Sequence, residues 1–264
     1  MTAASYRPPA LRTAATAKIA GQLVYAIGDI HGSYLLLRDL LARIVADAAA
    51  TARGRRPIII LLGDLIDRGP HSAQVVEAVT WLQRQHRFEM RLLMGNHERA
   101  MIAFIDHPAE AGEWLLFGGD ATLRCYGVEP PGPGAPTDAL IAARDALLQR
   151  MPAAHLLCLQ QALPMLTLGD YVFVHAGVRP GRPLTEQEEV DVLWIGAEFT
   201  ASTERFEKIV VHGHSIADEV QWPGNRIGID TGAYRSGILT ALRIEDDWLR
   251  LIQTGREDVR AAVA

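Results

Sequence analysis

The stretch PIIILLGDLIDRG, residues 57–69, carries an apolar run directly into a loop that holds two aspartates and one arginine. An unbroken run of branched apolar residues is typical of a strand that is buried on both faces of a sheet. Asp64, Asp67 and Arg68 follow where this strand should end. Charges crowded beside a buried strand are costly unless they are paired or bind something. We therefore expect this loop to carry a function.

Four other apolar runs end in polar clusters of the same kind. Each cluster pairs Asp, Asn or His with a glycine, which lets the backbone turn sharply. In open α/β sheets, ligands bind beyond the carboxyl ends of the strands, so the five loops are expected to meet in one crevice. The four other clusters are GDIHG (28–32), GNHE (95–98), HAG (175–177) and HGH (212–214).

These clusters offer oxygen and nitrogen donors and no thiolate, a set that suits Mn, Fe or Zn. Six or more donors exceed what one tetrahedral ion needs, whereas two ions about 3.5–4 Å apart that share a carboxylate would use them all. The alternative is that each Asp or His only caps a turn, but five such clusters at five strand ends favour a metal site. Spacing alone does not decide whether His212 or His214 is a ligand.

The order of the predicted elements indicates an α/β fold. Strand-like runs at 22–27, 57–62 and 90–94 alternate with helical patterns at 34–48 and 72–85. This order implies parallel strands with right-handed crossovers. The later part of the chain is rich in strands joined by short turns, so we expect two mixed sheets with helices outside them.

Four prolines in EPPGPGAP, residues 129–136, predict a surface connector between helices. We read the surrounding helical segment as an insertion between two halves of one sheet system. The chain is therefore expected to have a mobile N-terminal tail at 1–20, a single domain at 21–254 with a helical insertion around 107–162, and a C-terminal tail at 255–264.

Composition narrows the function further. The 264 residues carry a net charge of -5, which argues against a general nucleic-acid binder. No apolar run reaches the roughly 18 residues of a membrane span, and no apolar signal-peptide core is present. Cys125 and Cys158 lie far apart and read as reduced thiols. We expect a cytoplasmic protein without nucleic-acid or membrane partners, and the sequence leaves its oligomeric state open.

In their order and spacing, GDIHG, GDLIDRG, GNHE, HAG and HGH resemble the motifs of the metallophosphoesterases, specifically the PPP-type phosphoprotein phosphatase branch of the calcineurin-like phosphoesterases. WLLFGGDATLRCYG (114–127) and IGIDTGAYRSGILTALRIE (227–245) are similar to stretches of the bacterial and phage members. The likeness covers about residues 22–252. It implies a four-layer α/β/β/α sandwich of two mixed β-sheets flanked by helices.

The resemblance also implies the metal ligands. Two divalent ions would be bound, with Mn favoured and Fe or Zn as alternatives, and Asp64 would bridge them. Among the histidines of HGH it favours His214. The first ion would be held by Asp29, His31 and Asp64, and the second by Asp64, Asn96, His175 and His214.

Catalytic roles follow from the same resemblance. His97 would be the general acid and Asp67 its orienting partner. Arg68 would hold the phosphoryl group, with Asn96 and Arg235 as further candidates for substrate binding. A hydroxide that bridges the two metals would attack phosphorus in line.

Two positions depart from the family pattern. Gly196 stands where related chains carry a second phosphoryl-binding arginine, two residues after the tryptophan of VLWI, and Phe117 stands where a polar residue commonly precedes the Gly-Gly pair. Loss of a charge-assisted hydrogen bond worth about 1.5–3 kcal/mol slows catalysis about ten- to a hundredfold. A less cationic pocket would favour phosphodiesters or aryl esters. The sequence leaves open whether another arginine takes over, the candidates being Arg179, Arg182, Arg205 and Arg235.

The leading interpretation is a serine/threonine phosphoprotein phosphatase that acts on phosphorylated proteins, peptides or small phosphate esters. One alternative is a diadenosine tetraphosphatase or a promiscuous phosphodiesterase and aryl phosphatase, although Asp67 and Glu98 are retained where dinucleotide-hydrolysing relatives tend to differ. A second alternative is a degenerate module that binds phosphate or protein without catalysis. The physiological substrate, the resident metals and any regulator are not readable from the sequence.

Overall fold

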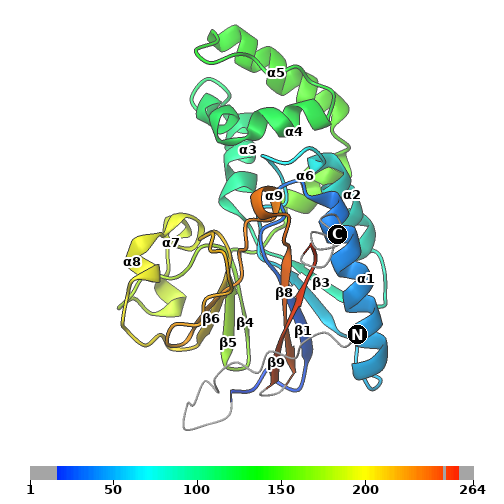
Figure 1. Cartoon of the computed structure of the whole chain (residues 1–264). Coiled ribbons are helices and arrows are strands. Elements are labelled where there is room, and N and C mark those ends of the chain that lie inside the picture. Colours follow the sequence, from blue (N-terminus) through cyan, green and yellow to red (C-terminus); the bar gives the residue numbers. More distant parts are fainter. Residues whose placement is uncertain (1–16, 246–247, 256–264) are drawn as a thin grey trace, which may run out of the picture.

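A computed structural model describes residues 17–245 and 248–255 and shows two β-sheets packed face to face (Figure 1). The strands of the first sheet are β1 (Leu23–Ile27), β2 (Ile58–Leu61), β3 (Glu89–Leu92), β8 (Thr240–Glu245) and β9 (Trp248–Gln253). Their order across the sheet is β3-β2-β1-β8-β9. The first three strands run parallel, as the βαβαβ pattern predicts, and β8 joins antiparallel to both β1 and β9.

The second sheet has the order β4-β5-β6-β7. Antiparallel β4 and β5 form a hairpin across Gly169 and Asp170, as expected, and β5, β6 and β7 run parallel. Both sheets therefore point several carboxyl strand ends toward the same end of the molecule. The strands are β4 (Met165–Leu168), β5 (Tyr171–Val174), β6 (Ile209–His212) and β7 (Arg226–Gly228).

The pleat of β1 divides the hydrophobic core. Val24 and Ala26 belong to the core between the two sheets, whereas Leu23, Tyr25 and Ile27 belong to the core between the first sheet and its helices. Successive side chains of a strand point to opposite faces, so this alternation places one buried layer on each side of β1. The unbroken apolar runs in the sequence reflect burial on both faces.

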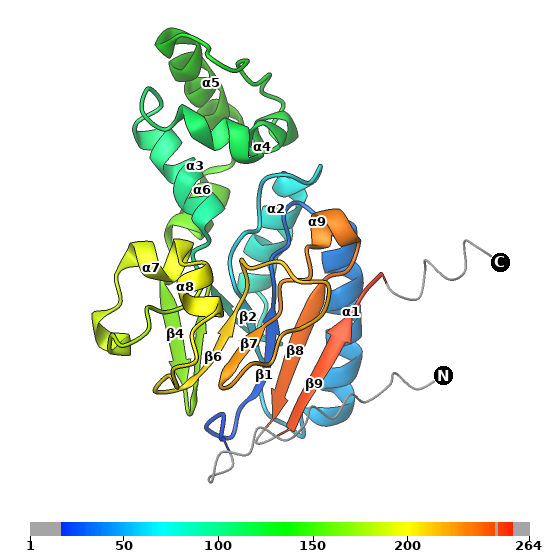
Figure 2. The ribbon, with the colours of Figure 1, turned by 60° about the vertical axis from the view of Figure 1, so that its left-hand side comes forward.

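Helices cover the two outer faces and complete the four layers (Figures 1 and 2). On the first sheet lie α1 (Tyr34–Thr51) and α2 (Ser72–Gln83). On the second lie α7 (Glu189–Trp194) and α8 (Ala197–Thr200), which pack on it through Val192 and Phe199. The short helices η2 (Leu184–Glu186) and α9 (Ala233–Ser236) lie in loops. The expected α/β/β/α sandwich is confirmed.

The chain between β3 and β4 forms a helical block that stands above one end of the sheets (Figure 2). The proline-rich segment 129–136 connects two of its helices, as predicted. Phe104, Trp114 and Leu123 tie this block to the core around the first sheet. Its elements are α3 (Asn96–Asp106), η1 (Gly112–Phe117), α4 (Gly119–Cys125), α5 (Thr137–Arg150) and α6 (Ala153–Gln160).

The division of the chain into a domain, an insertion and tails stays a prediction. Of the N-terminal tail expected at 1–20, residues 1–16 lie outside the described residues, and Ile19 is fully buried between the sheets. Of the C-terminal tail expected at 255–264, residues 256–264 lie outside them. Across the described residues, the helices are all too short or too polar to cross a membrane.

Candidate active site

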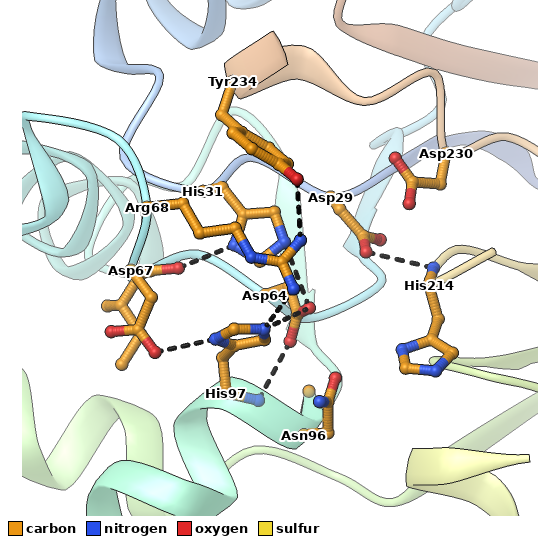
Figure 3. A network of polar contacts seen from close by, with 12 residues as sticks. Asp29, His31, Asp64, Asp67, Arg68, Asn96, His97, His214, Asp230 and Tyr234 are labelled. Carbon is orange, nitrogen blue, oxygen red and sulfur yellow. Dashed lines mark hydrogen bonds and ion pairs between the residues drawn. The ribbon is translucent and has the colours of Figure 1, made fainter. Parts of the chain in front are cut away.

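The five polar loops predicted from the sequence come together beyond the ends of β1, β2, β3, β5 and β6 (Figure 3). Most of their functional side chains are withdrawn from solvent, although they are polar or charged. The buried ones are Asp29, His31, Asp64, Asp67, Asn96, His97 and His175, and His214 is partly buried.

The loops hold strained backbone. In the described part of the chain, seven residues other than glycine have positive φ, and five of them lie in these loops. The left-handed region is unfavourable for residues with a Cβ and persists only where the surroundings impose it. The five are His31, Asp64, Asp67, Arg68 and His214.

Glu98 holds the loop after β2 in this conformation. Its buried carboxylate accepts hydrogen bonds from the backbone N–H groups of Asp64 (2.7 Å), Leu65 (2.8 Å), Ile66 (3.2 Å) and Gly95 (3.1 Å). The loop is thereby tied to the start of α3. In the sequence, the only sign of this role is a glutamate directly after the GNH of GNHE.

Two histidines present lone pairs to Asp64. His31 Nδ1 lies 2.9 Å from the carbonyl of Ile66, and His175 Nδ1 lies 2.9 Å from the carbonyl of Leu62. Because a carbonyl can only accept, both Nδ1 atoms carry the proton and both Nε2 atoms are acceptors. Burial lowers the pKa of His31 to about 4 and also lowers that of His175, so both rings are neutral at pH 7.

These acceptors face other acceptors. His31 Nε2 lies 3.3 Å from Asp64 Oδ2. His175 Nε2 lies 3.5 Å from Asp64 Oδ1 and 2.8 Å from Asn96 Oδ1. The pKa of Asp64 lies below its ordinary value although burial raises it, and the backbone N–H of His97 donates to Oδ1 (3.1 Å), so the carboxylate is ionised. Lone pairs that converge without a proton between them are the arrangement that a bound cation stabilises.

Asp29 enters the site from the other side (Figure 3). Its Oδ2 accepts a hydrogen bond from the backbone N–H of His214 (3.0 Å), and its Oδ1 is buried without a partner among the described residues. Burial raises the pKa of Asp29, and the nearby carboxylates of Asp230 and Asp64 raise it further. Asp230 is a buried acid that sequence analysis missed; the only hint was its place at a strand end in IGID.

The residues present fit two divalent cations. The nitrogen or carboxylate atoms of His31, Asp64 and His97 lie within 4.8 Å of one another, and so do those of Asp64, His175 and His214. Asp64 belongs to both groups, which is what a bridging ligand requires. Asp29 is in neither group but contributes the unpartnered oxygen. The six predicted ligands therefore surround one space, and their assignment to individual ions stays a prediction.

His97 belongs to the first of these groups by position, but its Nδ1 is paired with Asp67. Its Nδ1 lies 2.7 Å from Asp67 Oδ2, and its Nε2 lies 2.9 Å from Arg68 Nη2. Since arginine can only donate, Nε2 is the acceptor in this contact and the Nδ1 proton is donated to Asp67. Burial lowers the pKa of His97, but the carboxylates of Asp64 and Asp67 outweigh that effect and raise it above the ordinary value.

Arg68 is held between His97 and Tyr234. Its Nη1 lies 3.3 Å from the Tyr234 hydroxyl, and its guanidinium carbon lies 5.0 Å from the centre of the Tyr234 ring. That ring also meets His31 edge to face at 5.2 Å. Tyr234 lies on α9, and its side chain faces the site (Figure 3).

Other candidates lie elsewhere or are engaged. His212 packs its ring against Phe199, outside both groups of metal-ligating atoms. Arg179 pairs with Asp191 and Glu198, and Arg182 pairs with Asp191 and Glu188. Neither arginine is therefore free to replace the one missing at position 196. Arg235 is exposed on α9, and its role in substrate binding stays a prediction.

Comparisons with known proteins agree with this geometry. The chain matches the family model of the calcineurin-like phosphoesterases over residues 23–238. It is 27% identical over 238 residues to bis(5'-nucleosyl)-tetraphosphatase PrpE (asymmetrical) of Anoxybacillus flavithermus, covering 82% of this chain and 88% of that protein. It is also 27% identical over 232 residues to serine/threonine-protein phosphatase 2 of Escherichia coli, covering 84% and 93%.

Among solved structures, a candidate diadenosine tetraphosphatase has a TM-score of 0.59 at 21% identity, covering 91% of this chain and 99% of that one. An identity this low supports the fold alone. The family match, the strand-end motifs and the converging metal-ligating groups all point the same way. The chain belongs to the calcineurin-like phosphoesterases, in their PPP-type branch, and is a metal-dependent phosphoester hydrolase.

Proposed function

We propose that this hydrolase removes phosphoryl groups from serine and threonine side chains of proteins or peptides. The observation that carries the proposal is the buried contact of 2.7 Å between His97 Nδ1 and Asp67 Oδ2. An alkoxide is a poor leaving group and has to be protonated as it departs. An imidazole whose Nδ1 is held by a carboxylate can present a proton on Nε2 for that purpose.

The protein's own groups divide the remaining work. When bound, two divalent cations supply positive charge and a nucleophile derived from water at neutral pH. Arg68 offers its planar fork to the phosphoryl oxygens and lies 2.9 Å from His97 Nε2, so phosphoryl binding and proton donation take place side by side. Asp64 and Asp67 favour the protonated form of His97. Once Arg68 has turned from His97 Nε2 to the phosphoryl oxygens, Nε2 can carry a proton, which His97 would deliver to the departing oxygen.

The same pair argues against an anhydride as the preferred substrate. Cleavage within a polyphosphate chain releases a phosphate anion, which leaves readily and gains little from a general acid. A buried carboxylate is costly to maintain, and its placement against His97 is useful only where the leaving group needs a proton. The His97–Asp67 pair therefore supports an alkyl phosphate ester as the substrate.

Hydrolysis of diadenosine tetraphosphate is the second candidate. It is favoured by the relatives named bis(5'-nucleosyl)-tetraphosphatase and by two features of this pocket. First, Gly196 stands where related chains carry an arginine, so one positively charged side chain is missing. Second, the side chain of Phe117 is 56% exposed, and the next residue, Gly118, accepts a hydrogen bond from the Arg68 backbone N–H (3.1 Å). An exposed ring one residue before this backbone contact offers a stacking surface for a nucleobase.

A direct comparison tests the proposal. The purified enzyme with added Mn²⁺ is given a phosphoserine peptide, diadenosine tetraphosphate and bis(p-nitrophenyl) phosphate, and kcat/KM is measured for each. We expect the peptide to be turned over at least tenfold more efficiently than the other two. A higher kcat/KM for diadenosine tetraphosphate would favour the second candidate. Bound metal without turnover of any ester would contradict both.

A further inference from the structure

The carboxylate of Asp67 is held mainly by the helical insertion. Its Oδ2 accepts hydrogen bonds from Trp114 Nε1 (2.8 Å) and from His97 Nδ1 (2.7 Å), and its Oδ1 accepts one from Thr122 Oγ1 (2.6 Å). Trp114 is 2% exposed and Thr122 is fully buried. Two of the three side-chain donors on this carboxylate therefore come from one segment, made of η1 and α4.

The backbone of Asp67 is held by the same segment. Thr122 Oγ1 accepts a hydrogen bond from the Asp67 N–H at 2.9 Å, and Ser72 Oγ lies 3.1 Å from that nitrogen. Asp67 has a φ of 73°, which an aspartate adopts only when its surroundings impose it. Thr122 thus contacts both the side chain and the main chain of a strained residue.

The Gly-Gly pair inside the segment makes this contact possible. A Cβ at Gly118 would lie 2.8 Å from Arg68 Cγ, and a Cβ at Gly119 would lie 2.4 Å from the Trp114 ring. Gly118 also has a φ of 108°. The first glycine lets the chain pass Arg68, and the second lets the indole lie flat enough to aim Nε1 at Asp67.

A buried indole N–H needs an acceptor, and any backbone carbonyl would serve that need alone. Here the acceptor is the carboxylate that orients His97, and Thr122 holds its second oxygen. With a donor on each oxygen, the carboxylate plane is fixed and so is the direction in which Oδ2 meets His97 Nδ1. A carboxylate with fewer donors can rotate, and the imidazole then loses its orientation.

We propose that Trp114 and Thr122 are positioning residues, which act through Asp67 to hold His97 in the orientation that delivers a proton to the leaving group. This inference rests on the proposed role of His97. It assigns the insertion a part in catalysis, since the general acid is aligned by side chains that lie outside both sheets.

Leaving-group dependence tests this role. Trp114→Phe keeps a buried ring and removes the N–H, and Thr122→Val keeps the shape and removes the hydroxyl. With Mn²⁺ present, each should lower kcat about ten- to a hundredfold on a phosphoserine peptide, with KM within about twofold. On p-nitrophenyl phosphate, whose leaving group is a stable anion, the loss should stay below about threefold.

Two variants serve as controls. Thr122→Ser keeps the hydroxyl and should retain most of the activity. Trp81→Phe, at an exposed tryptophan of α2, should leave kcat and KM unchanged on both substrates.

A second readout needs no turnover. In protein with ¹⁵N-labelled histidine and diamagnetic Zn²⁺, the Nδ1 proton that His97 donates to Asp67 should give a downfield NMR resonance, identified by its absence in His97→Asn. Trp114→Phe should move this resonance and Trp81→Phe should not. An unmoved resonance, or equal losses on both substrates, would overturn the inference.

The His97→Asn variant separates the two proposals. If it loses activity selectively on the peptide while Trp114→Phe and Thr122→Val match the wild type, His97 is the general acid and only the positioning role is wrong. If His97→Asn loses activity equally on both substrates, the general acid itself is wrong, and the positioning role is overturned with it.

Discussion

At the residue scale, the loop that follows β2 assigns each of its charges to a different partner. Asp64 faces the imidazoles of His31 and His175, Asp67 orients His97, and Arg68 lies between His97 and Tyr234. Positive φ at all three residues makes neighbouring side chains leave the loop in different directions. Two carboxylates three positions apart therefore serve different chemistry without competing for one cation.

Arg68 is expected to carry most of the phosphoryl binding. With Gly196 in place of a second arginine, and Arg179 and Arg182 engaged elsewhere, Arg68→Ala should lower kcat/KM for a phosphoserine peptide about a hundredfold, the upper end for a charge-assisted contact. Arg68→Lys keeps the charge without the fork and should recover only part of this loss. A loss below tenfold for Arg68→Ala would mean that another cation binds the phosphoryl group.

Position 196 offers the reciprocal test. A Cβ at Gly196 would meet nothing within 4 Å, so a longer side chain has room. Gly196→Arg should raise kcat/KM for the phosphoserine peptide about tenfold and should raise it less for bis(p-nitrophenyl) phosphate, because a monoester carries more negative charge. Gly196→Ala controls for the backbone change and should leave the ratio of the two substrates unaltered. An unchanged ratio in Gly196→Arg would contradict the view that the missing arginine shapes substrate preference.

At the element scale, α7 anchors the loop that follows β5. Asp191 on this helix is buried and pairs with both Arg179 and Arg182 from the loop. The bond from Arg179 lowers the pKa of Asp191, and Arg182 adds to the effect. The loop begins at the predicted ligand His175, and the Val192 carbonyl of α7 accepts a hydrogen bond from the Ala176 N–H (2.9 Å), so α7 stabilises the metal-binding end of the second sheet.

This ion pair predicts a pH-dependent stability. Asp191→Asn should lower the free energy of unfolding at pH 7 by about 1–3 kcal/mol, measured by urea denaturation. Because the folded pKa lies below the unfolded value of about 3.9, the contribution is complete above that pH and is lost as the pH falls through the folded pKa. The gap between wild type and variant should therefore shrink below about pH 4. Glu198→Gln, which changes an exposed partner of Arg179, should cost less than about 1 kcal/mol.

The elements also show which parts of the site the sequence predicts. The six predicted ligands each follow an apolar run, and strand order alone brings such positions to one edge. Trp114 and Thr122 cannot be found in this way because they lie in the helical block between β3 and β4, and only its packing against α2 and α3 brings them to Asp67. Glu98 was visible in GNHE, but its four backbone partners depend on a loop conformation that no local pattern specifies.

At the scale of the whole molecule, the site joins the two sheets. Asp29, Asp64 and Asn96 follow strands of the first sheet, whereas His175 and His214 follow strands of the second. A cation bound between them would link the sheets at this end. Without a cation, burial and the nearby carboxylate of Asp64 raise the pKa of Asp29. Metal binding is therefore coupled to the stability of the sandwich.

Removal of metal should expose this coupling. Protein treated with EDTA should unfold at lower temperature than protein with Mn²⁺ in excess. An ion at a hundred times its dissociation constant stabilises by about 2.7 kcal/mol per site, which corresponds to about 5–10 °C for a chain of this size. Asp64→Asn, which removes the shared ligand, should lose most of the shift. An equal shift in that variant would contradict a centre built on Asp64.

The sheet order has a consequence for synthesis. β1 is made long before its second neighbour in the sheet, β8, because β2 to β7 lie between them in the chain. The ligands are likewise spread from Asp29 to His214. As the polypeptide leaves the ribosome, Asp29 and Asp64 emerge before His175 and His214, the predicted ligands from the other sheet. The centre is thus completed only after His214 has been translated, and an ion can bind between the sheets only when both of them have formed.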